Sequence, residues 1–134
     1  MDGKSPGALR TVDVQSGEVS TLVTAPADLQ FPSDIVVSPS GNSAYVADSG
    51  TNRVVSIDIE TGTLSTLVEN PSSEPPGLQD GSEPDLRFNL GSASLALTLD
   101  GAYLLLAESA NSAIRKIHVT SGQGASVQNV VCRV

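Results

Sequence analysis

Apolar and polar residues alternate along several short stretches of this chain. Val12 and Val14, and again Ile57 and Ile59, are separated by single polar residues. This two-residue period is typical of a β-strand with one buried face. A Ser-Gly or Thr-Gly pair begins two residues after each stretch, and such pairs favour tight turns between antiparallel strands. The pattern therefore predicts β-hairpins, and no stretch of the chain predicts a helix.

The hairpin pattern belongs to a repeated unit, because the sequence aligns with itself twice. Residues 10–23 align without gaps with residues 55–68. Residues 35–62 align with residues 95–122. These two stretches are further apart in the sequence than the first pair, and the residues that make up the difference fall in the segment 69–85. Two offsets that share one pattern indicate a repeat of about 45 residues with a loop insertion.

Four strands fit each complete unit. In the first complete unit we expect strands near residues 34–38, 43–48, 53–59 and 63–68. In the second we expect strands near residues 94–98, 102–108, 113–119 and 126–131. The first 24 residues hold only the last two strands of a unit. The apolar runs 34–38 and 95–97 predict strands that are buried on both faces between neighbouring units.

Four antiparallel strands repeated at this spacing are typical of β-propeller blades. A β-sandwich also uses short strands and regular turns, but sandwiches do not normally repeat their own sequence. We therefore predict an all-β fold of four-stranded propeller blades in an incomplete ring. The expected divisions are a half blade with a linker (1–30), a complete blade (31–69), an acidic, proline-rich interblade loop (70–87) and a second complete, degenerate blade (88–134).

One part of the chain resembles a known repeat family. Residues 31–41 place a proline before an apolar strand, and residues 44–54 read Ala-Tyr-Val-Ala-Asp-Ser-Gly-Thr-Asn-Arg-Val. This combination closely resembles the NHL repeat, which implies a propeller, of six blades in the common case. The next unit resembles it in eroded form, with Glu108, Ser112 and Ala113 in place of Asp, Asn and Arg. NHL repeats occur in scaffolds, receptors, ubiquitin ligases and a few lyases, so the resemblance says little about activity.

Polar residues of the repeat are candidates for a structural role. Asp48 and Asn52 flank a short connection and are expected to accept hydrogen bonds from its backbone N–H groups. Arg53 is expected to cross the blade face and pair with Asp48 or Asp34. Loop carboxylates that bind Ca²⁺ or a substrate are the functional alternative, which the eroded unit disfavours. The candidate structural residues are Asp34, Asp48, Asn52, Arg53 and Glu108.

Composition narrows the classes of function. The 134 residues include 15 acidic and 7 basic ones, giving a net charge of −8, and 3% are aromatic. An acidic surface with few rings disfavours nucleic-acid binding. One Cys and one His exclude a disulfide framework, a multi-thiolate site and a poly-histidine metal centre. No apolar stretch approaches a membrane span, no cofactor is predicted, and the localisation stays open.

The single histidine and the single cysteine are both expected to be structural. His118 occupies the strand position that Asp13 and Asp58 hold in the other units, which predicts a surface or interblade position. A general base is the alternative, but the chain has no Gly-x-Ser-x-Gly sequence to supply its nucleophile. Cys132 is expected to be a small buried apolar residue, and a reactive thiol beside Arg133 is the alternative.

The segment 69–85 is the most acidic part of the chain. Its four prolines and lack of basic residues predict an extended, mobile surface loop. The sharper hypothesis is a docking loop for a basic protein surface, in which case deleting residues 70–83 weakens binding and leaves folding intact. The residues of this candidate loop are Glu69, Glu74, Asp80, Glu83 and Asp85.

Two blades and a half leave blade faces uncovered at both ends. A ring of six blades needs roughly 270 residues, so we expect the chain to belong to a larger polypeptide or to associate with itself or another subunit. The leading prediction is a non-catalytic protein-interaction scaffold. The alternative is a propeller enzyme, lyase-like or lactonase-like and dependent on a divalent cation, of which this chain is a part.

Overall fold

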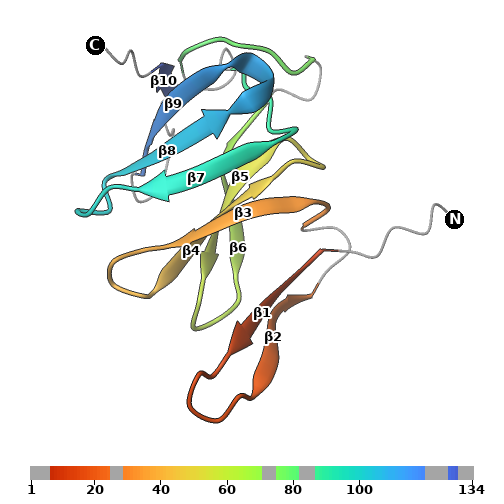
Figure 1. Cartoon of the computed structure of the whole chain (residues 1–134), viewed down its shortest axis with the longest axis vertical. Coiled ribbons are helices and arrows are strands. Elements are labelled where there is room, and N and C mark those ends of the chain that lie inside the picture. The colour runs from red at the N-terminus through yellow and green to blue at the C-terminus, as the bar shows by residue number, and fades with distance from the viewer. Residues whose placement is uncertain (1–6, 25–28, 71–74, 82–86, 120–126, 130–134) are drawn as a thin grey trace, which may run out of the picture.

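The computed structural model describes residues 7–24, 29–70, 75–81, 87–119 and 127–129. The described strands form three antiparallel sheets, which follow one another in chain order along the long axis of the molecule (Figure 1). The hairpin sheet consists of β1 (Ala8–Val12) and β2 (Val19–Thr24). The second sheet consists of β3 (Pro32–Val37), β4 (Ser43–Asp48), β5 (Arg53–Asp58) and β6 (Leu64–Glu69), paired in that order. The third sheet pairs β7 (Ala93–Leu97), β8 (Tyr103–Glu108), β9 (Ala113–His118) and β10 (Val127–Asn129).

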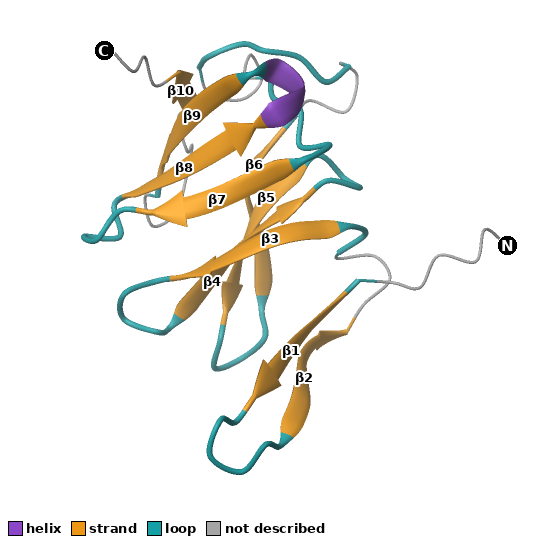
Figure 2. Ribbon diagram, viewed as in Figure 1, coloured by secondary structure: helices purple, strands orange, loops and turns teal. Residues whose placement is uncertain are grey.

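The second and third sheets share one register. Ser43 pairs with Asp58 between β4 and β5, and Tyr103 pairs with His118 between β8 and β9, as the self-alignment requires. The predicted all-β fold of four-stranded blades in an incomplete ring is confirmed. Within the described residues the one helical element is a 3-10 turn, η1 (Ser109–Asn111), the purple turn in Figure 2.

A carboxylate organises the β1–β2 turn and the equivalent β5–β6 turn. The Asp13 carboxylate accepts hydrogen bonds from the N–H groups of Gln15 and Ser16, at 2.9 and 2.8 Å. The equivalent Asp58 accepts from the N–H of Thr61 at 2.8 Å. The bonds from Ser16 and Thr61 are the main reason that the pKa of each carboxyl lies below its ordinary value.

The sheets pack through two apolar seams. The first seam lies between the hairpin sheet and the second sheet. Its buried residues are Val23, Leu29, Ala44, Val46, Val55 and Ile57, with Leu9, Leu22, Ile59 and Leu64 packed against them. The second seam lies between the second and third sheets. Its buried residues are Tyr45, Ala47, Val54, Val68, Phe88, Leu90, Ala93, Leu95, Leu104, Leu106 and Ile117.

The expectation that the apolar runs 34–38 and 95–97 are buried on both faces was wrong. Ile35 and Val37 are 41% and 53% exposed, and Ala96 is exposed. The runs lie in β3 and β7, and alternate side chains of both strands reach the second seam. Ile35 and Val37 lie on the other face of β3, towards the hairpin sheet, whose two strands leave them exposed, and Ala96 lies on the face of β7 that points away from the second seam. The strands with buried residues on both faces are β4 and β5, the interior strands of the sheet that lies between the two seams.

Candidate functional site

The polar residues of the repeat gather where β4 ends. Asp48 is completely buried, and its carboxylate accepts hydrogen bonds from the N–H groups of Gln30 and Phe31, the second at 2.7 Å. It also accepts from the Thr51 hydroxyl at 2.7 Å and from the N–H of Gly50. One carboxylate therefore holds both the connection after β4 and the segment that leads into β3.

Arg53 lies beside this carboxylate. Its Nε donates to the Thr51 hydroxyl at 2.9 Å and lies 4.0 Å from the nearer Asp48 oxygen. A second guanidinium nitrogen donates to the Thr66 hydroxyl at 3.3 Å. Since the Arg53 side chain is 16% exposed, part of its charge stays hydrated.

Four side chains of the second sheet and its connections bond to backbone groups across the second seam. The Ser33 hydroxyl donates to the Ala93 carbonyl at 3.3 Å, and we call the other three the connectors. The Asp34 carboxylate accepts from the N–H of Leu95 at 2.7 Å. The Asn52 amide accepts from the N–H of Leu90 at 2.8 Å and donates to the Phe88 carbonyl at 3.0 Å. The third connector is Asn70, whose amide bonds to both the N–H and the carbonyl of Phe88, each at 2.9 Å.

The sequence did not reveal Asn70 as a connector, and its only local signal is the Asn-Pro pair that follows the fourth strand of the unit. Asn52 is one of two non-glycine residues with a positive φ in the described chain, at 52°. Asparagine tolerates this left-handed conformation better than most residues, and the conformation turns its amide towards the third sheet. Ser112 holds the equivalent conformation at 51°, but it is not long enough to replace the amide.

The repeat unit of the third sheet contains a buried charge cluster, of which only Glu108 was predicted as a structural residue. Arg115 is wholly buried, and its guanidinium bonds to the Glu108 carboxylate at 3.0 Å and to the Arg87 and Gln79 carbonyls at 2.9 and 2.8 Å. It also forms an ion pair with Asp80 at 2.8 Å. In this unit the arginine lies two residues further along the same face of its strand, and glutamate is one methylene longer than aspartate. The shifted arginine together with the longer carboxylate was the sequence signal that could have revealed this cluster.

Arg115 also fixes the described part of the acidic segment. Gln79 and Arg87 bond to each other through both backbone groups, at 3.1 and 2.9 Å, and Asn111 donates to the Gly77 carbonyl at 2.8 Å. Residues 77–80 are therefore tied to the third sheet, although a projecting loop was expected. Of the predicted loop carboxylates, Glu69 ends β6 and Asp80 pairs with Arg115. The other three, Glu74, Glu83 and Asp85, lie outside the described residues, as does Cys132.

The outer face of the third sheet points away from the second seam, and we call it the open face. Its residues are Tyr103, Leu105, Ala107, Ile114, Lys116 and His118, on alternate positions of β8 and β9. Ile114 is 43% exposed, whereas the aligned Val54 is completely buried in the second seam. The Tyr103 and His118 rings lie 4.9 Å apart between centroids, and the Lys116 ammonium lies 4.9 Å from the centre of the Tyr103 ring. His118 thus belongs to an aromatic and cationic end of a sheet face.

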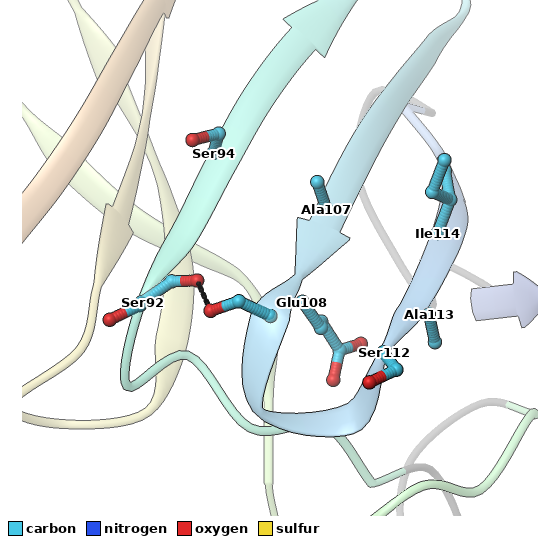
Figure 3. Close-up of a pocket in the computed structure, with 8 residues that line it drawn as sticks. Ser92, Ser94, Ala107, Glu108, Ser112, Ala113 and Ile114 are labelled. Atoms are coloured by element: carbon cyan, nitrogen blue, oxygen red, sulfur yellow. Dashed lines mark hydrogen bonds between the residues drawn. The ribbon is translucent and has the colours of Figure 1, made fainter.

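A shallow hollow of about 290 Å³ lies beside the open face (Figure 3). It occurs where the eroded repeat has small residues, because Ser94, Ser112 and Ala113 align with Asp34, Asn52 and Arg53. Figure 3 also shows the hydrogen bond from the Ser109 hydroxyl to the Ser92 carbonyl, at 2.6 Å. The lining residues are Ser92, Ser94, Ala107, Glu108, Ser109, Ser112, Ala113 and Ile114.

Comparison with known sequences identifies the repeat. Residues 29–55, which contain Asp34, Asp48, Asn52 and Arg53, match the sequence model of the NHL repeat. The chain contains an NHL repeat. No curated protein matches the whole sequence. The NHL repeat covers β3, β4 and the start of β5, so the Asp48 cluster and two of the three connectors belong to it.

One solved structure supports the fold, and a second shows a weaker likeness that supports no conclusion. A protein from Lactobacillus plantarum is 23% identical, with a TM-score of 0.57 over 92% of this chain and 34% of that one. A candidate 6-phosphogluconolactonase from Bacteroides uniformis is 15% identical, with a TM-score of 0.40 over 92% of this chain and 51% of that one. The chain therefore spans about a third and about half of these proteins. At such identities the likeness concerns the fold alone.

The described residues contain no group of three or more His, Cys, Asp or Glu side chains placed to hold a metal ion. Within the same residues no helix is long and apolar enough to cross a membrane.

Proposed function

We propose that the chain is a non-catalytic protein-interaction scaffold built from NHL-type blades and a component of a larger assembly. The observation that carries this proposal is the open face of the third sheet. It is the same blade face that the second sheet buries in the second seam, yet here Ile114 is 43% exposed, Ala107 is exposed and Leu105 is half-buried. Exposed apolar faces rimmed by polar residues are typical of protein–protein contacts.

The composition of the open face supports this role. Its centre consists of Leu105, Ala107 and Ile114, and one end carries the aromatic and cationic group of Tyr103, Lys116 and His118. An apolar centre with a charged rim is the usual anatomy of an interface, and a cation over an aromatic ring combines both properties in one contact.

The acidic segment is a second proposed contact, for a basic partner surface. Deletion of residues 70–83 no longer tests it cleanly, because this would also remove Asp80 and Gln79 from the buried Arg115. Neutralising other carboxylates of the segment with Glu74→Gln, Glu83→Gln and Asp85→Asn keeps Asp80 and Gln79, which bond to Arg115. The proposal expects slower association with the basic partner and an unchanged melting temperature.

Site-specific cross-linking tests the scaffold proposal. A photoreactive benzoylphenylalanine replaces Ile114 on the open face or, as a matched control, Leu99, which is 98% exposed in a turn. In a lysate of the natural source, the proposal expects defined cross-linked products from position 114 and none from position 99. It also expects Ala107→Glu to abolish them. Equal products from both positions, or none from either, contradict the proposal.

The enzyme alternative is tested separately. A propeller enzyme that depends on a divalent cation is expected to gain thermal stability when Ca²⁺ or Mn²⁺ binds and to lose it in EDTA. A melting temperature that is indifferent to both treatments counts against this alternative.

A further inference from the structure

The hairpin sheet has a second exposed blade face. Val12, Val14 and Val19 are 59%, 93% and 48% exposed, and we call these residues the hairpin face. The hairpin sheet lies at the other end of the row of sheets from the third sheet (Figure 1). Each of the two faces therefore presents apolar side chains to solvent at one end of the molecule.

The internal repeat shows what covers a face of the hairpin kind. Val12, Val14 and Val19 align with Ile57, Ile59 and Leu64 of the second sheet. Those three residues lie in the first seam, against the inner side of the preceding sheet, from which Leu9, Leu22 and Val23 come. We call the blade face that packs against the preceding blade its front and the opposite face its back. The hairpin face is thus the front of a blade, and within the chain a front is covered by the back of the preceding blade.

The repeat gives the complementary answer for the open face. Leu105, Ala107 and Ile114 align with Tyr45, Ala47 and Val54. The latter are covered in the second seam by the front of the following sheet. Among the described residues, the open face is therefore a blade back with no front against it, and the hairpin face is a front with no back against it.

We propose that the chain binds a second copy of itself head to tail, with the open face of one copy covering the hairpin face of its partner. This inference rests on the proposed scaffold function and names the occupant of its contact surface. Each copy supplies the kind of surface that the other lacks, by the packing that already joins the sheets within the chain. Such a contact is heterologous, because it joins two different faces of the same chain.

Charge favours the same arrangement. The open face carries Lys116 near His118, at the end of its sheet. The hairpin turn carries the exposed Asp13 and Glu18, and Asp13 aligns with His118 through Asp58. A copy stacked in the register of the seams brings its acidic turn to the cationic end of the open face. In a chain with a net charge of −8, such local attraction selects this orientation over others.

The lost connectors fit a contact between separate chains. Within the chain, Asp34 and Asn52 bond across the second seam to backbone groups of the next unit. On the open face their places are taken by Ser94 and Ser112, which line the hollow and leave room in the surface (Figure 3). The contact with a second copy therefore depends on apolar burial and charge, and it dissociates more readily than the seams.

Sedimentation equilibrium of the full chain and two variants tests this inference. Val12→Glu blocks only the hairpin face and Ile114→Glu only the open face, and both positions are exposed. We expect the unmodified chain to associate as its concentration rises, and each variant alone to stay monomeric. A 1:1 mixture of the variants is expected to restore a heterodimer, since each retains the face that the other has lost. Leu99→Glu is the matched control and is expected to associate like the unmodified chain.

Each contrary outcome overturns a defined part of the account. A monomeric unmodified chain overturns the second copy as occupant, and cross-links from position 114 to a different protein then leave the scaffold proposal standing. Failure of the mixture to form a heterodimer overturns the head-to-tail contact. Circular dichroism spectra that match the unmodified chain establish that the variants are folded. The absence of both self-association and cross-links overturns the scaffold proposal as well.

Discussion

The second and third sheets have the same strands and register, but different polar groups hold them in place. In the second sheet a completely buried Asp48 lies beside Arg53, whose side chain is 16% exposed, and the connectors bond to the next unit. In the third sheet the ion pair is Glu108 with a wholly buried Arg115, and it fixes the acidic segment instead. The eroded repeat thus keeps a carboxylate–guanidinium pair, but it has lost the Asp and Asn side chains that join the second sheet to the next blade.

The largest expected difference between the sheets concerns the two arginines. Arg115→Met leaves the Glu108 carboxylate buried without its partner, so we expect a loss of about 3–5 kcal/mol in the free energy of unfolding. Arg53→Met removes a guanidinium that is 16% exposed and 4.0 Å from Asp48. Because the Asp48 carboxylate keeps its hydrogen bonds from Phe31 and Thr51, the loss is expected to be smaller, about 1 kcal/mol. Urea unfolding followed by circular dichroism measures both values. Equal losses would contradict the distinction.

A double variant sharpens this result. Arg115→Met combined with Glu108→Leu removes both buried charges together and is expected to be more stable than Arg115→Met alone. If the double variant loses the sum of the two single losses, the charges act independently, and the cluster does not have the role described above.

The connectors should show the next largest difference. Asn52→Ala removes an amide that bonds to the N–H of Leu90 and the carbonyl of Phe88, both residues of the buried seam. Stranding these groups is expected to cost about 1–3 kcal/mol. Ser112→Ala, at the aligned exposed position, is expected to stay within about 0.5 kcal/mol of the unmodified chain. The midpoint of urea unfolding distinguishes the two variants. A loss of about 1 kcal/mol or more in Ser112→Ala would contradict the comparison, because it would mean that further contacts stabilise the open face.

The smallest expected effect concerns the hairpin turns and pH. Backbone hydrogen bonds, chiefly from Thr61, lower the pKa of Asp58 from its ordinary 3.8. A lowered pKa stabilises the folded state above pH 3.8, and this contribution is lost as the pH falls through the folded-state pKa. Asp58→Asn should therefore reduce the fall in melting temperature between about pH 5 and about pH 2.5. An NMR titration in which the Asp58 pKa is not lowered would contradict this explanation.

The strands and their pairing could be predicted because alternation and self-alignment are local properties of the sequence. The exposure of Ile35 and Val37 could not, because it depends on which sheet lies beside an edge strand. Arg115 was missed for a related reason. Two of its partners are carbonyls of Arg87 and Gln79, 28 and 36 residues earlier, and only the folded chain brings them to one point. Asn70 likewise acts through backbone groups that have no sequence signature.

The central claim is that one blade face is covered in the second sheet and exposed in the third. Thermal unfolding of Val54→Glu and Ile114→Glu, two aligned positions, tests it most directly. Val54 is completely buried in the second seam, so a carboxylate there should prevent folding or lower the melting temperature severely. Ile114→Glu, at a position that is 43% exposed, should melt within a few degrees of the unmodified chain at a concentration where both are monomeric. An equally severe loss at both positions would contradict the account.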